Sequence, residues 1–139
     1  MIYLFIVLGT KDYKDENKDA GSKNNNVLIS SNTVFEEINH SKVLSKFSSN
    51  SDSIIFFCTE GNKLCESYGM MLNSVAKENK VSKIYYYDFS VDRESNNATY
   101  EKIVGKLEDY LYYDDLGKQD LRNCSFVMLR NKMVYFYDD

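Results

Sequence analysis

The sequence has no proline or tryptophan and fewer basic than acidic residues. We attribute the absence of proline and tryptophan to coding bias rather than to a structural constraint. Basic residues are outnumbered, with 17 Lys and Arg against 21 Asp and Glu and a net charge of -4. Nucleic-acid binding needs a clustered basic surface, so this balance argues against nucleic acid as a partner.

Most catalytic and metal-binding patterns are also missing. The single histidine, His40, lies in a polar stretch and is better explained as a surface residue than as a base or a ligand. The sequence shows no Ser/His/Asp set, no zinc-ligand spacing and no phosphate-binding glycine loop. We therefore predict no metal site and no cofactor, and we set aside the hydrolase, zinc-finger and nucleotide-binding classes.

Cysteine is scarce, and its number is odd. The chain has three cysteines, Cys58, Cys65 and Cys124, which cannot all pair with one another. Cys65 falls in the first turn of a predicted helix, where the helix dipole favours a reactive thiolate. Because cysteine often serves as a small apolar core residue, buried unpaired thiols are the default expectation.

The N-terminal part separates into two segments. Residues 1–10 form an apolar run, far shorter than the ~20 residues of a membrane-spanning helix but suited to a signal or anchor segment, with an opening strand as the alternative. Residues 11–26 are charged and rich in asparagine, which predicts a flexible tether before a folded domain at 27–139. We expect an extracytoplasmic protein, secreted or associated with a membrane through its N-terminus, with a cytoplasmic location as the alternative.

Strands and helices alternate along the folded domain. Apolar runs predict strands over 27–29, 54–58, 83–89, 125–129 and 133–137, the last two joined as a hairpin. A capping-box pattern from Thr33 to Glu36 predicts a helix ending near Phe47. Helical spacing of apolar residues predicts further helices over 62–79 and about 100–111, with a polar loop over 90–97. The alternation predicts an α/β fold with parallel central strands and an antiparallel edge.

This order, with a cysteine at the start of the helix after the second strand, resembles the thioredoxin fold. The resemblance rests on residues 54–57 leading to Cys65, on 72–81 running into 84–88, and on 125–132. The sequence is similar to Gram-positive thioredoxin-like proteins of the bacteriocin transport accessory type, which are exported or membrane-tethered. The resemblance implies a central mixed sheet with a closing antiparallel hairpin and helices on both faces, without the usual C-terminal helix.

The resemblance also implies a degenerate redox centre. Active relatives use a Cys-x-x-Cys pair, in which one thiolate attacks and the other resolves the mixed disulfide. Here Asn62 stands in place of the attacking cysteine and Cys65 in place of the resolving one. Phe56 replaces a buried carboxylate, and Cys124 replaces a cis-proline. Without proline a cis bond costs ~3 kcal/mol, so we expect a trans bond and a reshaped loop before Cys124.

The same match predicts that Cys65 and Cys124 meet at a groove. The other residues assigned to it are Asn62, Lys63, Asn123 and Ser125. One hypothesis is a non-catalytic accessory domain that binds a protein or an extended peptide in this groove. The alternative is a weak thiol-disulfide oxidoreductase with Cys65 and Cys124 as its catalytic pair. Two buried unpaired thiols, or a bridge from Cys58 to Cys65, are the other states left open for the sulfurs.

Overall fold

The computed structural model describes residues 26–30 and 32–139. Its strands are β1 (Phe35–Glu37), β2 (Ser53–Cys58), β3 (Ile84–Asp88), β4 (Ser125–Arg130) and β5 (Met133–Asp138). Its helices are α2 (His40–Lys46), α3 (Lys63–Glu78), α4 (Ser90–Glu94) and α5 (Ala98–Lys106). The predictions for residues 1–10, and for the tether up to residue 25, lie outside the described residues.

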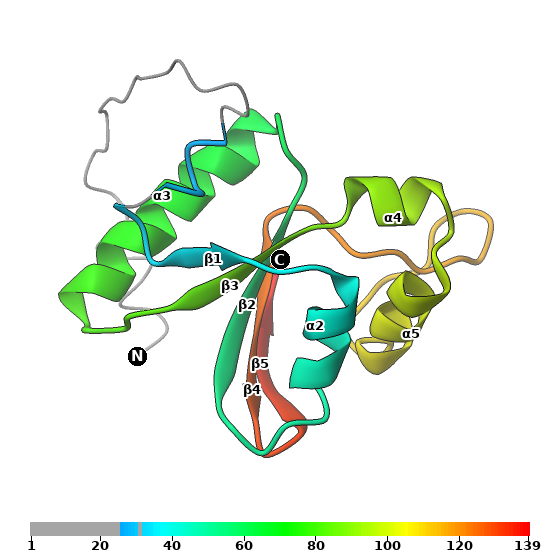
Figure 1. Ribbon diagram of the computed structural model, residues 1–139. Helices are drawn as coiled ribbons and strands as arrows, with labels where there is room; N and C mark the ends of the chain where they lie inside the picture. The colour runs from blue at the N-terminus through cyan, green and yellow to red at the C-terminus, as the bar shows by residue number, and fades with distance from the viewer. Residues whose placement is uncertain (1–25, 31) are drawn as a thin grey trace.

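The strands form one mixed sheet with the order β1-β3-β2-β4-β5 (Figure 1). β1 and β2 both pair in parallel with β3, while β4 runs antiparallel to β2 and β5 antiparallel to β4. β2 is therefore a central strand, and its continuous apolar sequence lets it bury side chains on both faces. Ile55 and Phe57 belong to one core cluster, whereas Phe56 and Cys58 belong to the other.

Helices cover both faces of this sheet. α2 and α5 lie on one side and α3 on the other, as Figure 1 shows. α3 contributes the buried side chains Leu72, Val75 and Ala76 to the cluster that contains Phe56 and Cys58. The opposite cluster takes Val43 from α2 and Tyr100, Ile103 and Val104 from α5. The predicted α/β architecture, with its closing hairpin and two helical layers, is confirmed.

Two predictions for the first part of the domain were wrong. Residues 27–29 form turns rather than a strand, and β1 occupies positions assigned to a helix. Phe35 pairs with Ile84 in β3, a contact that local sequence patterns do not reveal. The helix begins only at His40, where the Asn39 carboxamide caps it by accepting a hydrogen bond from the amide of Lys42 at 2.9 Å.

The later elements follow the predictions more closely. α3, β3 and the β4–β5 hairpin are confirmed, and α5 ends at Lys106 within the range assigned to it. The segment assigned as a polar loop instead contains the short helix α4. A residue that precedes α4 stabilises its first turn, because Asp88 Oδ1 accepts a hydrogen bond from the amide of Ser90 at 3.0 Å. Asp88 is the last residue of β3, so the sequence offers no reason to assign it to the start of a helix.

Candidate functional site: a disulfide beside an apolar groove

The loop between β2 and α3 is tightly organised. Gly61 adopts a φ of +87°, a left-handed conformation that glycine accepts without strain. Asn62 then caps α3, its Oδ1 accepting a hydrogen bond from the amide of Cys65 at 2.9 Å. The amide of Asn62 donates in turn to the carbonyl of Thr59 at 3.2 Å. Asn62, which the resemblance matches to a nucleophilic cysteine, therefore acts as a helix cap.

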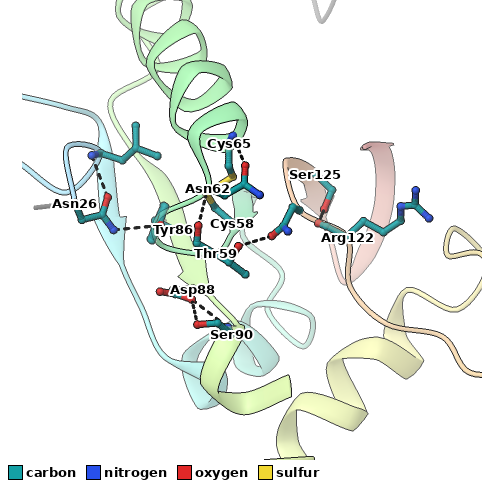
Figure 2. The surroundings of a disulfide bond; sticks show 12 residues. Asn26, Cys58, Thr59, Asn62, Cys65, Tyr86, Asp88, Ser90, Arg122 and Ser125 are labelled. Atoms are coloured by element: carbon teal, nitrogen blue, oxygen red, sulfur yellow. Dashed lines mark hydrogen bonds between the residues drawn. A yellow bond between two sulfur atoms is a disulfide. The ribbon is translucent and has the colours of Figure 1, made fainter. Parts of the chain in front are cut away.

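A disulfide joins the end of β2 to the first turn of α3. It links Cys58 to Cys65 with a Cα–Cα distance of 6.0 Å, and both residues are at most 1% exposed (Figure 2). The default expectation of buried unpaired thiols was therefore wrong for these two residues. The predicted pair of Cys65 with Cys124 is not the one that forms, since Cys65 is bonded to Cys58. The bond that is present is the Cys58–Cys65 bridge, which the sequence left open as one alternative.

Cys124 is a free thiol in the loop that enters β4. Its amide donates to the carbonyl of Phe57 at 3.1 Å, so its backbone lies against the residue that precedes Cys58. Its φ of +66° is left-handed, a conformation that is strained for cysteine. The described residues contain no cis peptide bond, in agreement with the trans bond expected here. Partial burial raises the pKa of the Cys124 thiol.

The loop before Cys124 is also tied to the loop before α3. Asn123 Oδ1 accepts a hydrogen bond from the Thr59 hydroxyl at 2.9 Å. The disulfide ties the end of β2 to the start of α3, and this hydrogen bond ties the β2–α3 loop to the loop before β4. The two loops that the family resemblance placed together do meet in the structure, although Cys65 does not reach Cys124 as a bonded partner.

An open groove of about 400 Å³ lies between α3, the loop before β4 and the end of β5. It is lined by Asn62, Leu64, Tyr68, Asn123, Cys124, Asp138 and Asp139. Leu64 is 73% exposed, so most of its apolar side chain is accessible at the groove. The Tyr68 hydroxyl donates to Asp138 Oδ2 at 3.0 Å, and burial, followed by this carboxylate, raises the pKa of the tyrosine.

The groove agrees only partly with the residues assigned to it from the sequence. Asn62, Asn123 and Cys124 line it. Ser125 does not, because it is fully buried and its hydroxyl donates to the carbonyl of Arg122 at 2.7 Å. Lys63 is exposed but is not one of the lining residues.

Four lining residues were missed by sequence reasoning. Leu64 and Tyr68 fitted the apolar pattern of the α3 core face, and only the three-dimensional structure shows that they border the groove. Asp138 and Asp139 come from the far end of the hairpin, and nothing in their local sequence connects them with Cys124. Arg122 Nε lies 3.5 Å from a carboxylate oxygen of Asp139, so these two side chains form an ion pair.

The core beneath this region is apolar. Phe56 is fully buried and packs against the rings of Phe35, Tyr68 and Tyr86, with centroid distances of 5.6, 5.8 and 6.2 Å. A carboxylate at this position could relay protons to a thiol, whereas a phenyl ring cannot. The site therefore lacks this means of activating a cysteine.

A second cavity, of about 330 Å³, lies at the same end of the sheet and includes His40. Its acidic lining residues are Glu37, Asp88 and Asp92. Burial, and then repulsion from Asp88 and Glu60, raise the pKa of Glu37. Within the described part of the chain, no group of three His, Cys, Asp or Glu side chains is arranged to hold a metal ion.

The strand order and the two helical layers decide the fold. The chain has the thioredoxin fold. Among solved structures it is similar to a thioredoxin from Nicotiana alata, with a TM-score of 0.48 and 8% sequence identity, over 77% of this chain and 81% of that chain. No protein-family model and no curated protein matches the sequence. None of the helices in residues 26–30 and 32–139 is long and apolar enough to cross a membrane.

Proposed function

We propose that this thioredoxin-fold domain binds an extended peptide or unfolded segment of a partner protein in the groove, without exchanging disulfides with it. The groove itself carries the proposal. It places the exposed side chain of Leu64 and the ring of Tyr68 beside hydrogen-bonding groups of Asn62 and Asn123. Apolar surface with a few polar groups is typical of sites that recognise a ligand.

The state of the sulfurs supports binding over catalysis. In a dithiol enzyme the attacking sulfur must be exposed, and here Cys65 is buried in a bond to Cys58 while Asn62 caps the helix. Phe56 supplies no proton relay. The specific observation that favours the enzymatic alternative is the free thiol of Cys124 in the groove, which a substrate cysteine could reach.

We also propose that the domain works outside the cytoplasm, as an accessory protein of the Gram-positive bacteriocin-transport type. The disulfide supports this location, because such bonds persist in oxidising compartments and are rare in the cytosol. The apolar run at residues 1–10 is consistent with export or a membrane anchor. The accessory role rests on the sequence resemblance alone and is independent of the peptide-binding proposal.

The binding proposal is tested with insulin B chain whose cysteines are blocked with iodoacetamide, so that no exchange can contribute. We expect saturable binding in fluorescence anisotropy. Leu64→Glu should weaken it about tenfold or more, because a buried leucine contributes about 1.5–3 kcal/mol to an apolar contact. Leu116→Glu is the matched control, since Leu116 is 92% exposed and does not line the groove. Equal loss in both variants, or no binding to the unsubstituted protein, would contradict the proposal.

An insulin-reduction assay separates binding from the enzymatic alternative. With dithiothreitol as reductant, the unsubstituted protein, Cys65→Ser and Cys124→Ser should all leave the uncatalysed rate unchanged. Turnover that is present in the unsubstituted protein and lost in either variant would establish the oxidoreductase instead.

A further inference from the structure

All three cysteines lie at the same end and on the same face of the sheet. Cys58 and Cys65 both belong to the α3-side core cluster, and the Cys124 side chain packs against that cluster. The backbone brings Cys124 close as well, through its hydrogen bond to the carbonyl of Phe57. The disulfide is buried and the thiol is half-buried, so external reagents reach Cys124 before they reach the bond.

We propose that these residues form a three-cysteine exchange site, in which the disulfide moves within the chain from Cys58–Cys65 to Cys58–Cys124. The thiolate of Cys124 attacks Sγ of Cys58, and the bond between Cys58 and Cys65 breaks. Cys65 leaves as a thiolate and takes up a proton equivalent to the one that Cys124 lost. One disulfide and one thiol are present before and after, so no external oxidant or reductant is needed.

The surroundings of the two bonded sulfurs differ in a way that selects Cys58 as the target. Cys65 sits in the first turn of the 16-residue helix α3, where the positive end of the helix dipole stabilises a departing thiolate. Cys58 lies in the central strand, and because both sulfurs are buried in the same apolar cluster, the helix start is what distinguishes Cys65 from Cys58 as a leaving group. A better leaving group departs faster, so release of Cys65 is preferred to release of Cys58. Cys58 also directly follows the residue to which Cys124 is hydrogen-bonded.

The exchange would change the groove as well as the bond. Cys124 lines the groove, and its sulfur would turn toward β2 on forming a bond with Cys58. At the same time, α3 would lose its covalent link to the strand, and Cys65 would become the free thiol. The site thus couples the position of one disulfide to the shape of the groove. The inference does not require the groove to bind a peptide and can be tested without any ligand.

The first experiment uses the unsubstituted protein. It is held at about pH 9.5, because burial raises the pKa of the Cys124 thiol and less thiolate forms at lower pH, and it is then quenched in acid to stop exchange. Free thiols are labelled with N-ethylmaleimide, and the labelled cysteine is identified by peptide mass spectrometry without reduction. We expect a measurable fraction labelled at Cys65, with Cys58 and Cys124 recovered as a linked peptide pair. Label on Cys124 alone, at every incubation time, would overturn the proposal.

The second experiment uses a matched pair of variants with oxidised glutathione. Cys65→Ser leaves Cys58 and Cys124, and should close to a monomeric intramolecular disulfide. Cys58→Ser leaves Cys65 and Cys124, and should close more slowly or stop at a glutathione adduct of Cys124. Circular dichroism checks that both variants are folded. Faster closure in Cys58→Ser, or a folded Cys65→Ser that keeps two separate sulfurs, would overturn the assignment of Cys58 as the partner.

Discussion

Breaking the Cys58–Cys65 bond should lower the stability of the domain by an amount set mainly by loop length. The two residues are separated by seven positions, so the bond closes a short loop. In the chain-entropy model, a loop of that size constrains the unfolded state by about 2–2.5 kcal/mol. For a domain of this size, such a loss corresponds to a decrease of about 7–12 °C in the melting temperature.

The measurement is best made in a Cys124→Ala background, because the unfolded chain then has no third thiol with which to reshuffle the bond. Urea unfolding is followed with and without tris(2-carboxyethyl)phosphine, so only the bond differs between the two samples. The same background carrying Cys58→Ala and Cys65→Ala is the control and should not respond to the reductant. If mass spectrometry shows both thiols free while the free energy of unfolding is unchanged, the bond does not stabilise the native fold.

Two further predictions concern packing at Gly69 and the thiol of Cys124. A Cβ at Gly69 would lie 2.6 Å from Leu28 Cδ1 and 3.2 Å from Phe56 Cε2, whereas one at Gly105 meets nothing within 4 Å. Gly69→Ala should therefore be about 1–3 kcal/mol less stable than Gly105→Ala in urea unfolding, and equal stabilities would contradict the packing described. Burial raises the pKa of Cys124, so its iodoacetamide reactivity should rise at a higher pH than that of an unfolded thiol. The folded state keeps this proton to a higher pH, so the free energy of unfolding should decrease as the pH rises from the thiol pKa of the unfolded chain to that of the folded one. An iodoacetamide reactivity of the folded protein with its midpoint at or below the thiol pKa of the unfolded chain would contradict this prediction.

The central elements could be predicted because their signals are local. Residues 54–58 form a continuous apolar run, and the chain buries such a run on both faces of a sheet. The spacing of apolar residues along α3 likewise predicts which face of that helix is buried. β1 could not be predicted, because only three residues pair and their partner strand begins at Ile84. The capping-box pattern at Thr33 favoured a helix locally, and the pairing with β3 outweighed it.

The site was harder to predict because its residues come from distant parts of the chain. Asn62, Asn123 and Cys124, which the family resemblance assigned to a groove, all line the cavity between α3 and the loop before β4. The resemblance did not indicate that Cys65 would bond to Cys58, since spacing alone leaves every pairing of three cysteines open. Asp138 reaches the groove only because β5 folds back on β4 and ends beside Tyr68.

The position of the disulfide bears directly on how the groove can work. With Cys58 bonded to Cys65, the loop between them is held by that bond, by the hydrogen bond from Asn62 to Thr59 and by the one from Thr59 to Asn123. A wall fixed in this way loses little freedom when a ligand binds, which favours affinity. Cys65, which the resemblance matches to a resolving cysteine, anchors the wall of the groove through its bond to Cys58, so in this disulfide state the start of α3 is held against β2.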